Sequence, residues 1–304
     1  MFNGILPMYK PKGMTSHDLV FKARKILKMK KIGHTGTLDP DVDGVLVLCL
    51  GQATKLVDYF MEGKKEYRGS ICLGYATETE DASGNIIQRT PVLSPVSVDL
   101  IDQAMEKFQG NITQIPPYYS AVKVKGRRLY DYARKGEMVE RPRRQVTIYN
   151  FERTSQPLFD SDHLNQVWDF KVVCSKGTYV RTLAVDLGRA LGYASHMNDL
   201  QRTQSAGFNL QACNRLEDLS KLSPDEVANV IVPLSFVRDR IPSIDLRDDQ
   251  VFKVEHGQVV DKNYFDEEVN QATALFYQEN LLAIYKPHPE KPGKLKPHKM
   301  FPRL

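Results

Sequence analysis

Apolar positions along the chain follow helical spacing in some segments and strand-like runs in others. Between residues 15 and 28 they recur every three or four positions, and Thr15 stands three residues before Asp18, the spacing of a capping box. This predicts a helix that begins at Thr15. The same kind of spacing predicts helices over residues 53–61, 98–108 and 180–191.

Short apolar runs predict the strands. The run VLVLCL at residues 45–50 lies between Gly44 and Gly51, which is typical of a buried strand. Similar runs occupy residues 66–73, 146–151, 167–174, 274–277 and 281–285. Helices and strands therefore alternate irregularly.

Breaks in these patterns indicate how the chain is organised. Pro116 and Pro117 precede a segment, residues 118–145, in which tyrosines are mixed with basic residues, and we expect it to project as an RNA-binding arm. A boundary near residue 240 divides a large domain, 1–239, from a small one, 240–304, which we expect to be dispensable for folding of the first. The last 19 residues are rich in Lys and Pro and predict a weakly ordered tail.

Composition excludes several protein classes. The 304 residues are 41% hydrophobic, so the chain can bury a full core. No apolar run approaches the ~20 residues that span a bilayer, and the first residues lack a secretory signal, so we expect a cytoplasmic protein. The four cysteines are far apart, which argues against disulfides or a zinc site and for buried, reduced thiols.

Charge is distributed unevenly. Residues 9–31, 121–145 and 286–304 carry net charges of +7, +6 and +5, whereas the whole chain carries only +5. A single basic segment is usually a solvated face. Three of them on an otherwise acidic chain favour a polyanion as partner, because phosphate neutralisation releases counterions. Nucleic acid is the expected partner.

The loop of residues 33–44, GHTGTLDPDVDG, contains the most distinctive polar residues. No Lys follows its glycines, so it is not a phosphate-binding P-loop. Asp39 stands before Pro40 and is therefore biased toward an extended backbone. Asp-Pro also occurs in ordinary turns, so spacing alone leaves open whether this loop is an active site or a turn.

Four longer strings resolve this choice, because together they resemble the TruB family of pseudouridine synthases. They are YKPKGMTSHD from Tyr9, KKIGHTGTLDPDVDGVLVLCLG from Lys30, KKEYRGSICLG from Lys64, and GTYVRTLAVDLG from Gly177 followed by HMNDLQRTQSAGF. They occur in the family's order over residues 5–210. A match to all of them by chance is very improbable.

The resemblance implies roles for seven residues. Asp39 corresponds to the essential carboxylate, Tyr67 to the tyrosine that packs on the target base and takes part in proton transfer, and Arg181 to the arginine that pairs with the carboxylate. The residues expected to hold the flipped-out nucleotide are Lys10, His34, Tyr179 and Leu200. By position alone, these side chains would more often be core rings, a surface cation or a loop cap.

The reaction explains the residue types. Forming pseudouridine breaks the N1 glycosidic bond and rejoins the base through C5, so it needs neither oxidation nor an outside reactant, and we expect no cofactor and no metal. The nucleotide must be flipped into a pocket. Asp39 must be ionised there; burial raises its pKa, and a close Arg181 lowers it again by ~1–3 units. We expect Asp41 and Asp43 to point to solvent, since an inward carboxylate would oppose this ionisation.

The resemblance also implies a fold and partners. It predicts the α+β pseudouridine synthase fold, a mixed sheet flanked by helices, with residues 118–145 as a thumb-like insertion and residues from 240 as a small PUA-like β domain. The expected substrate is the T-stem-loop of tRNA, modified at position 55, without an obligate protein partner and by a monomer. The sequence of attack, through a covalent C1′ adduct or a glycal, stays open.

Three other functions fit parts of the sequence. A guide-RNA-dependent enzyme of the same superfamily would need partner proteins. An RNA chaperone would have the same charge pattern, but no need of Asp39, Tyr67 and Arg181 together. A phosphate-handling enzyme would require a nucleotide.

Overall fold

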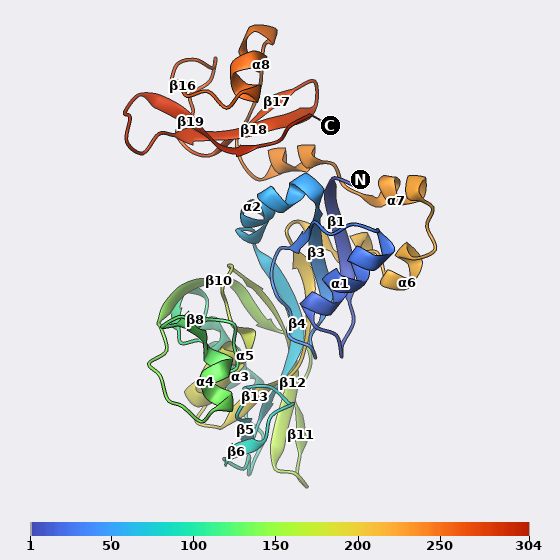
Figure 1. The fold of residues 1–304 in the computed structure, drawn as a ribbon. Coiled ribbons are helices and arrows are strands. Elements are labelled where there is room, and N and C mark those ends of the chain that lie inside the picture. Colours follow the sequence, from blue (N-terminus) through green and yellow to red (C-terminus); the bar gives the residue numbers. More distant parts are fainter. Residues whose placement is uncertain (1, 304) are drawn as a thin grey trace.

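The computed structural model describes residues 2–303, and its centre is a ten-stranded mixed β-sheet (Figure 1). The main path runs through β1 (Gly4–Lys10), β3 (Asp43–Leu50), β13 (Ser195–Ser205), β4 (Lys65–Leu73), β12 (Asn165–Cys174), β10 (Arg144–Arg153) and β7 (Gly110–Gln114). The short strands β2 (Ile32–His34), β11 (Leu158–Asp160) and β14 (Phe208–Asn209) pair with β3, β12 and β13. Within the described residues only β3 and β13 are parallel neighbours in this sheet, so the sheet is mixed as expected.

The position of β3 between two hydrophobic cores explains why residues 45–50 are all apolar. Its side chains alternate between two cores: Leu46, Leu48 and Leu50 face one, and the residues between them face the other. All eight residues of the strand are buried. A strand buried on both faces reads as a continuous apolar run, and the prediction of a core strand here is confirmed.

Helices cover one face of this sheet. They are α1 (Ser16–Ile26), α3 (Val98–Glu106), α5 (Val180–Ala190), α6 (Leu216–Leu219) and α7 (Pro224–Val230). The predicted start of α1 is confirmed, because Thr15 and Asp18 form a reciprocal capping box. The helix predicted over 53–61 is divided into a 3-10 turn, Gly51–Leu56, and α2 (Val57–Met61); the Thr54 hydroxyl donates to the Gly51 carbonyl within the turn.

Two small substructures project from the sheet (Figure 1). One is a hairpin of β5 (Tyr75–Thr77) and β6 (Ile86–Arg89), and the other is the arm, with β8 (Lys123–Val124), β9 (Arg127–Arg128) and α4 (Leu129–Arg134). Both lie toward the end of the molecule opposite the C-terminal sheet.

The C-terminal residues form a five-stranded sheet at the other end. Its strands, in spatial order, are β15 (Ser243–Asp245), β17 (Thr273–Tyr277), β18 (Asn280–Pro287), β19 (Lys294–Met300) and β16 (Val260–Asp261), with helix α8 (Asp248–Glu255) beside them. The prediction of a weakly ordered tail is wrong. Leu295 and Phe301 are buried and hold β19 in the sheet, although the surrounding lysines and prolines conceal this in the sequence.

The two sheets share a hydrophobic core. Ile5, Val45 and Val47 from the large sheet belong to the same buried cluster as Phe276 and Phe301 from the C-terminal residues. The Gln52 amide also donates to the Pro302 carbonyl at 2.9 Å. The predicted boundary near residue 240 falls just before β15, but independent folding of the two parts stays a prediction.

Two further properties concern the described residues as a whole. None of their helices is both long and apolar enough to cross a membrane. Cys49, Cys72 and Cys174 are buried free thiols, and Cys213 is a half-buried one.

Candidate active site

Residues of the first motif, YKPKGMTSHD, hold the loop that carries Asp39. The Ser16 hydroxyl, at the start of α1, donates to the Leu38 carbonyl at 3.1 Å and accepts from the Leu38 N–H at 2.8 Å. The Gly13 N–H and the Lys10 ammonium both donate to the Pro40 carbonyl, at 3.0 and 3.1 Å. The backbone on both sides of Asp39 is therefore held in place.

Gly44 lets this loop enter the sheet. Its φ is +114°, and a Cβ built on it would lie 2.1 Å from the Arg202 carbonyl oxygen of the neighbouring strand β13. A side chain cannot be placed there without moving backbone. The glycine therefore permits the close approach of β3 and β13 where the Asp39 loop ends.

Arg181 pairs with Asp39, as the resemblance implied. Its Nη2 lies 3.0 Å from Asp39 Oδ2. Arg181 stands in the first turn of α5, and only 7% of its side chain is exposed, whereas 43% of the Asp39 side chain is exposed into the cavities beside it. The arginine is thus part of the wall, and the carboxylate is the group that a ligand can reach.

Further contacts fix the guanidinium in place. Nη1 donates to the Thr79 carbonyl at 2.8 Å and lies 3.6 Å from Asp81 Oδ2, and Nη2 donates to the Tyr119 carbonyl at 2.9 Å. Asp81 is itself held by the Thr79 and Ser83 hydroxyls, at 2.7 and 2.6 Å. Arg181 therefore joins the Asp39 loop, the β5–β6 hairpin and the arm.

The surroundings of Asp39 raise its pKa, whereas we expected Arg181 to offset the effect of burial. Burial raises the pKa of Asp39, Arg181 lowers it, and the nearby negative charge of Asp81 raises it, with the balance above the usual value. The Arg181 charge is shared between two carboxylates, so it does not fully compensate the loss of solvent. The anionic form of Asp39 is therefore less favoured than that of an exposed aspartate.

Two hollows meet at the Asp39–Arg181 pair, and we name them the inner and the outer cavity. The inner cavity, of about 300 Å³, is lined by Asp39 and Arg181 together with Gly36, Met61, Lys65, Tyr67, Lys176, Tyr179, Leu200, Arg202 and neighbouring loop residues. The outer cavity, of about 600 Å³, is lined by the same pair together with Asp41, Thr79, Asp81, Tyr119, Arg134, Asp199 and neighbours. A nucleotide placed in either one would lie against the Asp39 carboxylate.

Tyr67, Tyr179 and Leu200 line the inner cavity with Asp39 and Arg181. Burial raises the pKa of Tyr67, an effect opposed by the Arg202 guanidinium, so the phenol stays protonated at neutral pH. Burial also raises the pKa of Tyr179. Five of the seven residues implied by the resemblance therefore meet in one cavity.

Lys10 and His34 lie outside both cavities. The Lys10 side chain is fully buried, and its ammonium donates to the carbonyls of Pro11, Met14 and Pro40. His34 is half-buried in β2, and its Nδ1 accepts the Gly36 N–H at 3.3 Å. In this structure both support the backbone around Asp39.

Asp43 contradicts the expectation that it points to solvent. It is buried, and its carboxylate accepts from the Tyr9 hydroxyl and from the Gln201 amide at 2.8 Å. The reason is that Asp43 begins β3 and pairs with Gln201 of β13, so neighbouring strands enclose it. Asp41 is exposed as expected, and it adds only a minor upward effect on the pKa of Asp39.

Sequence reasoning missed three polar residues at the site, Lys65, Asp81 and Arg202. Asp81 lies in the acidic string TETED, which has no spacing that would single it out. Lys65 and Arg202 stand inside quoted motifs, two residues before Tyr67 and two after Leu200. Residues two apart on a strand point to the same face of the sheet, so the spacing from Tyr67 and Leu200 could have identified Lys65 and Arg202.

Two aromatic residues of the arm pack within the arm itself. Guanidinium groups of the arm lie over its own rings, Arg127 over Tyr132 at 4.2 Å and Arg141 over Tyr118 at 4.5 Å. Tyr132 is buried, and its hydroxyl donates to the Val124 carbonyl at 3.1 Å. These rings build the arm, while most of its lysines and arginines stay exposed.

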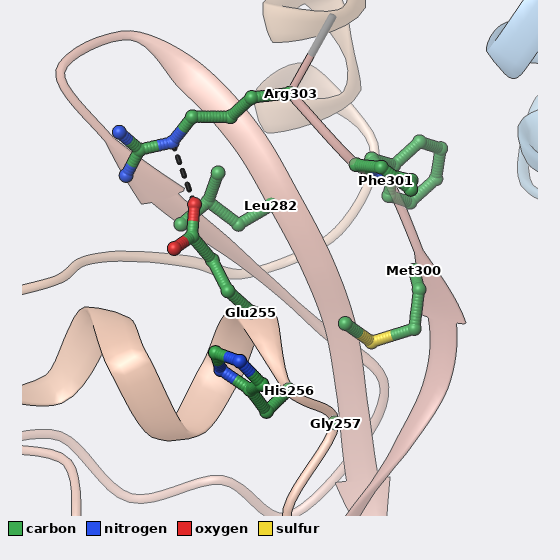
Figure 2. Close-up of a pocket in the computed structure, with 8 residues that line it drawn as sticks. Glu255, His256, Gly257, Leu282, Met300, Phe301 and Arg303 are labelled. Atoms are coloured by element: carbon green, nitrogen blue, oxygen red, sulfur yellow. Dashed lines mark ion pairs between the residues drawn. The ribbon is translucent and has the colours of Figure 1, made fainter.

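A separate cavity lies in the C-terminal sheet (Figure 2). Leu282, Met300 and Phe301 form its apolar walls, and Glu255 and Arg303 point toward each other as an ion pair of 2.7 Å. Its two opposite charges compensate each other, and it contains none of the seven implied residues. It is therefore not the candidate active site.

Family models match most of the chain. The model described as TruB family pseudouridylate synthase (N terminal domain) matches residues 24–180, and the model described as tRNA pseudouridylate synthase B C-terminal domain matches residues 181–236. A protein of Streptococcus mutans named tRNA pseudouridine synthase B is 49% identical over 99% of this chain and 100% of its own length. A protein of the same name from Halalkalibacterium halodurans is 47% identical over 98% and 97%.

Solved structures agree on the fold. The protein in a structure titled "Crystal Structure of a Cbf5-Nop10-Gar1 Complex" superimposes with a TM-score of 0.74 and 26% identity, over 99% of this chain and 87% of that chain. A second, titled "Structure of H/ACA RNP bound to a substrate RNA containing 2'-deoxyuridine", has a TM-score of 0.72 at 24% identity, over 99% and 85%.

Proposed function

Because the chain belongs to the TruB family of pseudouridylate synthases, we propose that it converts one uridine of tRNA into pseudouridine and that Asp39 is the carboxylate that acts on the nucleotide. The enzyme is an isomerase. The observation that carries the assignment of Asp39 is its 3.0 Å pair with the buried Arg181, at the junction of two cavities.

The inner cavity suits a single flipped-out nucleotide. It is lined by Tyr67 and Tyr179, by the apolar side chain of Leu200 and by the Asp39 carboxylate. A uridine inside a tRNA loop reaches such a cavity only by leaving its stack, at a cost of a few kcal/mol that contacts with the RNA backbone offset. Exposed basic residues of the arm, which lies next to Arg181 through Tyr119, are placed to make such contacts.

Asp39 acts on the sugar in either route that the sequence left open. As an anion it can attack C1′ covalently, or it can stabilise positive charge at the sugar as the N1–C1′ bond breaks. Arg181 keeps the carboxylate ionised and oriented in both. The protonated Tyr67 hydroxyl, beside the base, is available for proton transfer when the base is rejoined through C5.

We propose that the target is uridine 55 in the T-loop, as the resemblance in four motifs implies. The basic arm lies toward the end of the molecule opposite the C-terminal sheet, so the two would contact different parts of the RNA (Figure 1). The guide-RNA alternative is disfavoured, because the relatives at 47–49% identity over the full length are named as tRNA enzymes.

Release of tritium tests the proposed function. Unmodified tRNA labelled at C5 of uridine should release tritium to water when the purified protein is added, in the presence of EDTA and without a nucleotide. A tRNA in which only uridine 55 is replaced by cytidine is the matched substrate control and should release none from that site. No release from the parent tRNA under these conditions would overturn the proposal.

A further inference from the structure

Two cations in the inner cavity have no acidic partner. Lys65 on β4 and Arg202 on β13 are 7% and 1% exposed, and neither forms an ion pair with a carboxylate in the described residues. Lys65 donates to the Met61 and Gly63 carbonyls at 2.9 and 3.4 Å. Arg202 donates to the Val45 and Gly36 carbonyls at 2.8 and 3.1 Å. Buried charges are usually paired, so the cavity contains an excess of positive charge that a ligand can balance.

The two cations flank Tyr67. Lys65 stands two residues before Tyr67 on the same strand and so on the same sheet face, and Arg202 is the direct cross-strand partner of Tyr67. A Cβ built on Gly36 would lie 3.8 Å from both Lys65 Cε and Arg202 Nη1. The positive charges therefore converge on the space between Tyr67 and the Asp39 loop.

The neighbours of Lys65 differ from those of the other buried lysine. Lys10 has the carboxylates of Asp43, Asp39 and Asp41 around it. The charged and titratable groups around Lys65 are Arg202, the Cys174 thiol, Glu62 and Lys176, of which Arg202 has the largest effect and opposes the ammonium. Burial and Arg202 lower the pKa of Lys65 to about 8, so it is still mainly charged at pH 7.

The depth of these groups indicates which part of the RNA they face. A flipped nucleotide stays joined to its chain, so its phosphates remain near the cavity mouth, where the exposed Lys176 lies, and its base goes deepest. The outer cavity suits an anion less well than the inner one, because its four aspartates, Asp41, Asp81 and Asp199 besides Asp39, outnumber its two arginines. The buried cations thus face the base.

We propose that Lys65, with Arg202 beside it, stabilises the negative charge that the uracil ring carries while it is detached from the sugar. Breaking the N1–C1′ bond leaves the electron pair on the base, and forming the C5–C1′ bond uses a pair of the same anion. C5 then loses its proton and N1 gains one, so no other reactant is needed. This inference rests on the proposed function and adds the residues that would hold the departing base.

Lys65→Met tests the proposal, with Lys64→Met, the exposed neighbour that lies over Tyr149, as the matched control. We expect Lys65→Met to bind tRNA as the parent does but to lose ~10²-fold in single-turnover tritium release, as when one preorganised donor to a developing anion is removed. With tRNA containing 5-fluorouridine, whose uracil anion is intrinsically more stable, the loss in consumption of fluorouridine should shrink to ~10-fold. An equal loss on both substrates, or weaker tRNA binding alone, would indicate a phosphate contact or a purely structural lysine and would overturn the proposal.

The pH dependence provides the second test, and it also applies if Lys65→Met fails to fold. The single-turnover rate of the parent should decline above pH 8 as Lys65 loses its proton, while tRNA binding changes little. Lys65→Arg, which stays charged, should move this decline to higher pH. A flat parent profile, or the same decline in Lys65→Arg, refutes the inference. Failure of the parent to release tritium at any pH refutes the proposed function instead, so the two failures are distinguishable.

Discussion

Deleting residues 240–304 removes one side of the core that the two sheets share. Ile5, Val45, Val47 and Phe60 on the remaining side are buried in the same cluster as Phe276, Leu281 and Phe301 of the deleted part. Full exposure costs ~1.5–3 kcal/mol for each large apolar side chain. If half the area of those four residues becomes exposed, the loss is about 3–6 kcal/mol, a large share of the ~5–15 kcal/mol that stabilises a typical domain.

The truncated protein should therefore be unfolded or aggregated, contrary to what the position of the motifs suggested. Thermal unfolding followed by circular dichroism checks this, with full-length Phe276→Ala as a milder perturbation expected to lose ~3–5 kcal/mol. Phe265→Ala, in the separate core of the C-terminal sheet, shows whether that sheet melts with the rest. A truncated protein that unfolds cooperatively within a few degrees of the full-length chain would show that the shared core contributes little.

Three further outcomes are expected. The pKa of Asp39 is higher in the folded than in the unfolded chain, so the parent loses stability as pH rises from the ordinary aspartate pKa toward the folded-state pKa. Asp39→Asn lacks this effect, so its melting temperature should rise relative to that of the parent as pH rises above about 4. A difference in melting temperature that does not change with pH would contradict this cause. Gly44→Ala should unfold more easily, because its Cβ would meet the Arg202 carbonyl at 2.1 Å, and unchanged urea unfolding would show that the strands can separate at no cost. Reversing four exposed or half-exposed charges of the arm should weaken tRNA binding and make it less dependent on salt. Filter-binding titrations at several salt concentrations measure this dependence. If the affinity changes with salt as steeply as in the parent, the arm is a solvated face. Those four are Arg127, Arg128, Arg143 and Arg144.

The sequence predicted those parts of the fold that depend on residues close together along the chain. The capping box at Thr15 and the doubly buried β3 each follow from a few adjacent residues. The strand β19 does not, because its register is set by β18 and by two buried residues among lysines and prolines. Nor does the shared core, which joins segments more than 200 residues apart.

Residues of the candidate active site were predictable only where they lie in one of the quoted motifs. Asp39, Tyr67 and Arg181 come from three separate strings, and the structure brings them to one cavity. The second partner of Arg181, Asp81, belongs to a hairpin with no distinguishing pattern. Asp43 was misplaced because, four residues after Asp39, it resembles any polar loop residue in the sequence. Only the pairing of β3 with β13 encloses it.

The rate of Asp39→Asn in a single turnover tests the central claim most directly. Asparagine keeps the size of the side chain but removes the anion. Asp225→Asn, at an exposed carboxylate that lies in neither cavity, is the matched control. At saturating enzyme, tritium release from 5-labelled tRNA should fall at least ~10³-fold in Asp39→Asn, equivalent to ~4 kcal/mol, and change little in Asp225→Asn. An Asp39→Asn rate within ~10-fold of the parent, about 1.4 kcal/mol, would contradict the role of Asp39.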